Sequence, residues 1–183
     1  MKDGIKIKGN VRVRVFDADG ELKRRNPGFF RRLFGLRGKP AVQEFHNIVT
    51  RQGDALIADS LLAAPARKKV SDASGFIQVG SGWKNGTHKH AARCAAPAGN
   101  MRALDGGYPV LAASWGDTGD TTVVYRATFA AGTLDADGIN EACLLNGNGS
   151  AADCLAYARI APAVNVAASD TLQIVWEITI VGQ

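Results

Sequence analysis

Residue types that bind metal ions gather in one short segment, at His88, His90 and Cys94. Histidines two residues apart on an extended segment point to the same side, as two ligands of one zinc ion would. A zinc site needs a third and a fourth ligand, and only Cys94, His46 and distant carboxylates are available for them. We therefore interpret the segment as a polar loop and expect no metal and no other cofactor.

Asp117-Thr118-Gly119 has the residue types of the active-site triplet of aspartic proteases, which pair two such carboxylates at a dimer axis. In those enzymes an apolar strand residue usually precedes the triplet and a small residue follows it, whereas here the neighbours are Gly116 and Asp120. We interpret the triplet as a turn between strands at 109–115 and 121–129. Elsewhere in the sequence, no arrangement of Ser, His and Asp or of Cys and His is more suggestive of a catalytic triad or dyad than chance would produce. We therefore expect no enzymatic activity.

Two kinds of glycine-containing motif could hold an ion or a phosphate. Asp-Ala-Asp-Gly occurs at 17–20 and again at 135–138, but a calcium loop needs more carboxylates at fixed alternating positions. Gly80-Ser81-Gly82 follows a predicted strand at 76–79, and a Gly-x-Gly without a further Gly and a helix is a weak phosphate-loop signal. Asp and Gly are common turn residues, so we interpret all three motifs as turns.

The three cysteines are Cys94, Cys143 and Cys154. If 144–145 and 155–157 are paired antiparallel strands, we expect Cys143 to lie directly opposite Cys154. A cross-strand disulfide can then form, provided that the pair is a close, non-hydrogen-bonded one. Proteins kept inside cells usually keep their thiols reduced, whereas oxidising surroundings would allow the bridge, so both states stay open.

Strict alternation of apolar and polar residues predicts a strand at each end of the chain. The cationic face of the first strand, at about 5–15, carries Lys6, Lys8, Arg12 and Arg14. This face is either solvated, which also guards a sheet edge against pairing, or it contacts an acidic neighbour. The final strand, 171–181, places its apolar side chains on one face: Leu172, Ile174, Trp176, Ile178 and Ile180.

One helix accompanies these strands. Ile57 and Leu61 follow helical spacing, and Asp54 near the start favours the helix dipole, so we predict a helix at roughly 53–63. The chain has 183 residues, 46% of them hydrophobic, which suits a single domain over 1–183. We therefore predict a mainly β fold, an antiparallel β-sandwich like a jelly roll, with this one short helix.

Positive charge is concentrated at the start of the chain. Residues 1–39 hold twelve Lys and Arg against four Asp and Glu, whereas residues 40–183 hold ten against thirteen. This asymmetry indicates a basic attachment on a mildly acidic body, and we expect no nucleic-acid partner. The chain has no run of about 18 apolar residues and begins with a charged segment, so we expect neither membrane insertion nor Sec export.

The basic insert at about 22–40 is predicted to hold a short cationic amphipathic helix. Asn26 suits the N-cap and Pro27 the first helical position. Such a helix could pack against protein, contact phosphates or lie on a membrane, and we favour protein packing. Because aromatic and Arg residues dominate interfaces, the candidate interface residues are Phe29, Phe30, Arg31, Arg32, Leu33 and Phe34, with Arg12 and Arg14 of the first strand.

Several short motifs follow one another along residues 42–181. They are HNIVT at 46–50, Ala-Thr-Phe at 127–129, INEACLL at 139–145 and DTLQIVWEI at 170–178. In order and spacing they resemble a family of small tailed-bacteriophage virion proteins. Members of that family are tail-fibre, neck or collar, and head-decoration components, so the resemblance implies a structural protein.

The resemblance implies a non-enzymatic neck/collar or tail-fibre-associated subunit that docks on neighbouring virion proteins. Such a protein would be made in the host cytoplasm and reside in the virion as a homo-oligomer, a trimer or a ring, with no membrane partner. Two alternatives stay open: a capsid decoration (head cement) protein, or a receptor-binding module of a fibre that recognises glycans through loops 80–108 and 146–153. The chain departs from the family pattern in the basic insert, in 84–108 and at Cys143, where we expect Gly. These departures leave the attachment partner open.

Overall fold

The computed structural model describes residues 5–24, 42–83, 88–112 and 120–182. Its helical elements are α2 (Arg51–Ser60) and a single 3-10 turn, η1 (His88–His90). The strands are β1 (Ile5–Phe16), β2 (Gln43–Val49), β3 (Phe76–Gly80), β4 (Arg102–Ala103), β5 (Val110–Leu111), β6 (Asp120–Phe129), β7 (Ala136–Leu145), β8 (Cys154–Val166) and β9 (Thr171–Gly182). None of the helical segments in these ranges is long and apolar enough to span a membrane.

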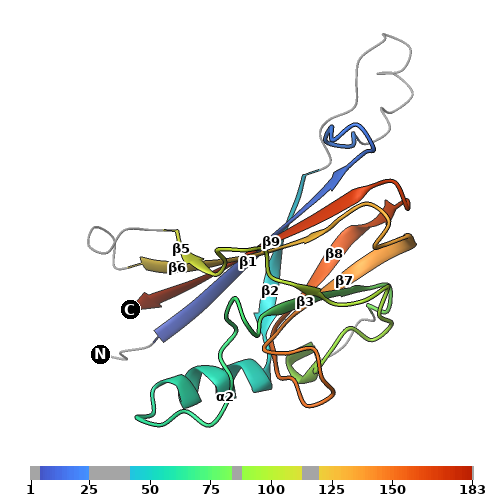
Figure 1. Ribbon diagram of the computed structural model, residues 1–183. Coiled ribbons are helices and arrows are strands. Elements are labelled where there is room, and N and C mark those ends of the chain that lie inside the picture. The colour runs from blue at the N-terminus through green and yellow to red at the C-terminus, as the bar shows by residue number, and fades with distance from the viewer. Residues whose placement is uncertain (1–4, 25–41, 84–87, 113–119, 183) are drawn as a thin grey trace.

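The strands form one antiparallel sheet of nine, in the order β4-β3-β7-β8-β2-β1-β9-β6-β5 (Figure 1). The sheet curls strongly into a half-barrel, so its two halves face each other. The prediction of a mainly antiparallel β fold with one short helix is confirmed. The two-sheet sandwich is not what the structure shows, because β2 pairs with β1 on one side and with β8 on the other and makes the two halves continuous.

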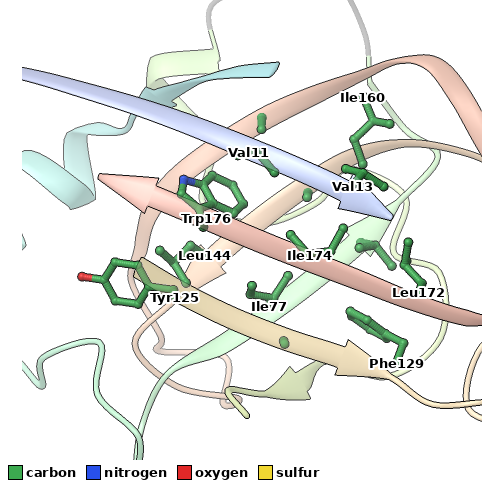
Figure 2. Close-up of a cluster of buried hydrophobic side chains, with 14 of the residues drawn as sticks. Val11, Val13, Ile77, Tyr125, Phe129, Leu144, Ile160, Leu172, Ile174 and Trp176 are labelled. Atoms are coloured by element: carbon green, nitrogen blue, oxygen red, sulfur yellow. The ribbon is translucent and has the colours of Figure 1, made fainter. Parts of the chain in front are cut away.

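Alternating side chains of β1 and β9 build the core inside the curl. Val11 pairs with Trp176 and Val13 with Ile174, and all four side chains are fully buried. In Figure 2 these residues of β1 and β9 face side chains of β3 and β7, including Leu144. The alternation predicted for 171–181 is thus confirmed through Ile178, whereas Ile180 is 40% exposed at the end of the strand.

Strands β7 and β8 are buried on both faces over 141–145 and 154–158. Their inner side chains join the main core, and their outer side chains form a second apolar cluster under the segment that contains η1. Continuous apolar runs are typical of strands covered on both faces, and Leu155-Ala156-Tyr157 is such a run. The buried members of the second cluster are Cys94, Cys143, Leu145, Cys154 and Tyr157.

Helix α2 begins two residues earlier than predicted and ends three residues earlier. Thr50 is its N-cap and accepts a hydrogen bond from Gly53 N at 3.0 Å. The helix packs closely on β8, since a Cβ on Gly53 would lie 2.0 Å from the carbonyl oxygen of Leu155. The helix ends at Ser60, so residues 61–63, which were predicted to be helical, lie beyond it, and Leu61 and Leu62 are exposed.

Two of the predicted turns differ in outcome. At 17–20 the chain turns as expected, with Gly20 at φ 78° and Asp17 Oδ1 accepting from the N–H groups of Asp19 and Glu21. The motif at 135–138 instead starts β7, and Gly138, at φ 69°, lies where the pairing with β8 shifts register. A glycine at positive φ is usual in such a bulge. The triplet at 117–119 lies outside the described residues. Of the predicted strand 109–115, β5 covers 110–111, and residues 113–115 also lie outside the described residues.

Candidate functional site

Of the predicted interface residues, the structure describes Arg12 and Arg14 on β1. Arg12 Nη2 lies 3.0 Å from an oxygen of Glu177, and its Nε lies 3.8 Å from Glu44. Arg14 donates to the side-chain oxygen of Gln173 at 3.3 Å. Both arginines therefore bind side chains of their own sheet. The other candidates, Phe29, Phe30, Arg31, Arg32, Leu33 and Phe34, lie outside the described residues.

The predicted polar loop around His88 and His90 is a 3-10 turn, so the two histidines do not follow the extended geometry assumed from the sequence. His88 stacks on Trp83 with ring centroids 3.6 Å apart and also stacks on Tyr157. Lys89 of the same turn donates to the carbonyl of Val49 at 2.8 Å, which ties the turn to the start of α2. Within the described ranges, no group of three or more His, Cys, Asp or Glu side chains is placed to hold a metal ion.

A buried carboxylate, Glu141 of β7, is the centre of the polar contacts beside this turn. Its side chain is fully buried, and Oε1 accepts from Gly82 N and from Ala96 N, both at 2.9 Å. Oε2 accepts from Ala95 N at 3.0 Å and from the phenol of Tyr157. Four donors on one carboxylate offset the cost of burying its charge. The Glu141 carboxylate therefore clamps segments 80–83 and 94–96 to the sheet.

Gly80-Ser81-Gly82 is the turn that wraps this carboxylate. A Cβ on Gly80 would lie 2.6 Å from Glu141 Oε1 and 2.4 Å from the carbonyl oxygen of Ala96. Gly80 is the last residue of β3, the chain bends at Ser81, and Ser81 N donates to Ala96 O at 2.9 Å. Of the N–H groups that a phosphate loop would offer to a ligand, that of Gly82 binds the Glu141 carboxylate and that of Ser81 binds the carbonyl of Ala96.

The predicted pairing of Cys143 with Cys154 is wrong. In the sheet Cys143 lies opposite Tyr157, and Cys154 lies opposite Leu145, and Asn146 closes the hairpin through three hydrogen bonds with Asp153. The pairing is therefore shifted by two residues at the loop. All three cysteines are free and buried in the structure, so the predicted bridge between Cys143 and Cys154 lacks the directly opposed geometry on which it rested.

The thiol of Cys143 interacts with both Cys94 and Cys154. Cys94 is the neighbour on the covering segment. The Sγ atoms of Cys94 and Cys143 lie 3.3 Å apart, and Cys94 also donates to the carbonyl of Gln78 at 3.4 Å.

Burial raises the pKa of the Cys94 thiol and raises that of Cys143 well above its usual value. Burial, together with the hydrogen bond to Glu141, also raises the pKa of Tyr157. These groups are therefore protonated at neutral pH and are not activated nucleophiles.

An exposed apolar surface lies at the end of α2. Leu61 is 81% exposed and Leu62 is 58% exposed, directly after Ser60, which lines a groove of about 200 Å³. We call this groove together with the two leucines the helix-end surface. Apolar residues of the groove are Leu56, Ile57, Val70, Tyr125 and Leu155, and its basic residues are Arg67, Lys68 and Lys69.

The basic side of the helix-end surface is only partly neutralised. Arg67 pairs with Asp153 at 2.8 Å. Lys68 and Lys69 are exposed and form no ion pair with any residue that the structure describes. An apolar groove with free ammonium groups beside it complements a partner segment that is both apolar and acidic.

The loop suggested for glycan recognition also borders a hollow. Residues 146–153 and the segment 66–68 line a groove of about 450 Å³. Of the described residues that line it, none is aromatic, although stacking on an aromatic ring is the contact that the glycan hypothesis invoked. The groove therefore favours polar contacts over sugar stacking.

Sequence reasoning missed both Glu141 and the helix-end surface. A signal for Glu141 was present, because it stands two residues before Cys143 and four before Leu145, and alternate residues of a strand face the same side. No comparable signal pointed to Leu61 and Leu62, whose helical spacing predicts burial. Their exposure is seen only in the structure, where α2 ends at Ser60.

Comparison with protein-family models, with curated proteins and with solved structures finds no match to this chain. Function is therefore inferred from the motifs of the sequence and from the geometry of the described residues.

Proposed function

We propose that this chain is a non-enzymatic structural subunit of a tailed-phage virion that docks on neighbouring virion proteins as a neck/collar or tail-fibre-associated component. Support comes from the ordered motifs that resemble such proteins, and from the helix-end surface. That exposed apolar surface is the observation that carries the docking role. We also propose that the chain acts as a homo-oligomer, a trimer or a ring.

The helix-end surface has the composition of a docking site. Large apolar side chains that are more than half exposed, such as Leu61 and Leu62, lose contact with water when a partner covers them. Lys68 and Lys69 beside them offer charge to an acidic partner. This site differs from the one expected at Phe29–Phe34, and the two together would suit a subunit with contacts on two neighbours.

The use of the interior carboxylates also favours a structural role. Glu141 binds three backbone N–H groups and a phenol, and Asp105 binds the side chains of Arg126 and Thr128 at 2.7 and 2.8 Å. Asp170 binds Lys23 at 2.5 Å. Each of these carboxylates is engaged in holding one part of the chain to another, which is the function that polar groups have in a scaffold.

The test uses tailed particles produced by the genome that encodes the chain. Quantitative mass spectrometry of purified particles is expected to find the protein at a fixed copy number, and native mass spectrometry of the isolated protein to find a trimer or a ring. Absence of the protein from washed particles contradicts the proposal. A monomer that joins the particle overturns only the proposed oligomer.

A pair of matched variants tests the docking surface. Leu62→Asp should reduce incorporation into particles by roughly tenfold or more, because it places a charge in the proposed contact. Leu111→Asp is the control, since Leu111 is 50% exposed on β5 and Leu62 is 58% exposed. Equal incorporation of the two variants, both with an unchanged circular dichroism spectrum, would remove the helix-end surface from the proposal.

A further inference from the structure

The contact between Cys94 and Cys143 has the geometry of a disulfide that has not formed. The two Sγ atoms are 3.3 Å apart, and a disulfide needs them at about 2 Å. Cys94 lies in the segment after η1, and Cys143 lies in β7, 49 positions further along the chain. A small movement of the Cys94 segment would bring the two sulfur atoms to bonding distance.

The backbone on both sides of this contact is held in place. Cys94 N donates to the side-chain oxygen of Gln78 at 3.1 Å, and Gln78 lies directly opposite Cys143 in the sheet. The next two N–H groups, of Ala95 and Ala96, bind the carboxylate of Glu141. Cys94 is thus positioned over Cys143 by hydrogen bonds that do not involve either thiol.

Cys154 lies in the same apolar cluster but is oriented differently. Its thiol donates to the carbonyl of Ala156 at 3.3 Å. Its partner across the sheet is Leu145, so it is offset from Cys143 along the strand. Cys143 therefore has two thiol neighbours, and Cys94, whose Sγ lies 3.3 Å away, is the one on a different segment of the chain.

We propose that Cys94 and Cys143 are an oxidisable pair that forms a disulfide when the protein meets a small peroxide. The thiol of Cys94, 5% exposed against 0% for Cys143, first loses its proton to water, which its raised pKa makes slow at neutral pH, and its sulfur then attacks one peroxide oxygen. The O–O bond breaks, and a sulfenic acid and hydroxide result. The Cys143 thiol then loses its proton as its sulfur attacks the Cys94 sulfur, the S–O bond breaks, and a second hydroxide leaves. With the two thiol protons, both hydroxides become water, and two electrons have passed from the thiols to the peroxide.

The bridge would convert a reversible attachment into a covalent one. Residues 81–83 and 88–98 are held to the sheet by the hydrogen bonds of Glu141 and by apolar packing. A disulfide between positions 94 and 143 closes a long loop and restricts the unfolded chain, which stabilises the folded state. The inference concerns the isolated chain and does not rest on the proposed virion role.

The experiment treats the reduced, folded full-length chain with a small excess of hydrogen peroxide, then alkylates the remaining thiols under denaturing conditions. The intact mass should show the loss of two hydrogen atoms and a single alkylated cysteine. Peptide mapping without reductant should join the Cys94 peptide to the Cys143 peptide, and a reducing agent should reverse the change. The midpoint of thermal unfolding of the bridged form should rise by roughly 5 to 10 °C.

Variants and a denatured control decide between the pairings. Cys154→Ser should still form the bridge, whereas Cys94→Ser should form none. Oxidation in concentrated urea should lose the preference for Cys94 with Cys143, because there the folded geometry no longer selects the pair. A wild-type map that joins Cys143 to Cys154 overturns the proposal, and so do three free thiols or sulfinic acids after peroxide treatment of the folded protein.

Discussion

The phenol of Tyr157 on β8 donates a hydrogen bond to the carboxylate of Glu141 on β7, within a part of the protein where both side chains are buried. The same carboxylate receives three backbone N–H groups from segments that cover the outer face of the two strands. One acidic side chain therefore connects two strands and two loop segments.

Replacing this carboxylate should destabilise the fold strongly. Glu141→Gln places an amide NH2 group among N–H donors, so at least one hydrogen bond is lost and two donors oppose each other. We expect the free energy of unfolding to fall by about 2 to 4 kcal/mol in urea denaturation followed by tryptophan fluorescence. Glu44→Gln is the control, because Glu44 is 56% exposed and its change should cost less than about 0.5 kcal/mol. If both variants lowered the free energy of unfolding equally, the structural role of the Glu141 hydrogen bonds would be contradicted.

The turn that wraps Glu141 should tolerate no side chain at Gly80. A Cβ there would lie 2.4 Å from the carbonyl oxygen of Ala96, which is backbone and cannot rotate away. Gly80→Ala is therefore expected to lower the free energy of unfolding by about 2 to 3 kcal/mol. Gly106→Ala, where a Cβ meets nothing within 4 Å, should be close to neutral in the same denaturation experiment. A neutral Gly80→Ala would show that the turn is looser than the structure indicates.

Acid should weaken the ion pair of Asp170 with Lys23. Burial raises the pKa of Asp170, but the hydrogen bonds from Lys23 and from Ala167 N outweigh it, so the net pKa is lowered. A lowered pKa stabilises the folded state above the unfolded-state value of about 4, and this stability is lost as pH falls through the folded-state pKa. In urea titrations at a series of pH values, Asp170→Asn should be less stable than the wild type at pH 7. The difference should shrink below about pH 4. A difference independent of pH would exclude the ion pair as its cause.

Alkaline titration should be delayed for two of the three tyrosines. Burial raises the pKa of Tyr125 to about 12, and that of Tyr157 is raised as well. Because the folded-state pKa is the higher one, Tyr125 favours folding below about pH 10, and this contribution is lost as pH rises from 10 toward 12. Ultraviolet absorbance of tyrosinate should show late ionisation, and Tyr125→Phe should remove one late component. Ionisation of every tyrosine near pH 10 in the folded protein would contradict the buried environments.

Local patterns predicted most strands correctly. The alternation around Val11 and Trp176 specifies which face of each end strand is buried, and the structure pairs these two residues. The cap at Thr50 lies only three residues before the predicted start of the helix. Such features depend on neighbours within a few residues, and sequence periodicity reports them directly.

Sheet closure, strand register and side-chain contacts across the sheet depended on the whole chain. Nothing local indicates that β2 pairs on both edges and makes one curled sheet where two were expected. A shift of two residues at the Asn146–Asp153 hairpin, with a further irregularity between Leu144 and Leu145, moved the partner of Cys143 by three positions, from Cys154 to Tyr157.

The sequence by itself determined that the chain is mainly antiparallel β with one short helix, because apolar periods of two and 3.6 are properties of consecutive residues. Only the tertiary structure decided which polar groups meet. Glu141 binds N–H groups of 82, 95 and 96, and Cys94 reaches Cys143, because the curled sheet brings distant segments over β7. The structure likewise decided that α2 ends at Ser60 and that Leu61 and Leu62 face solvent, since burial depends on which segments of the chain lie around a side chain.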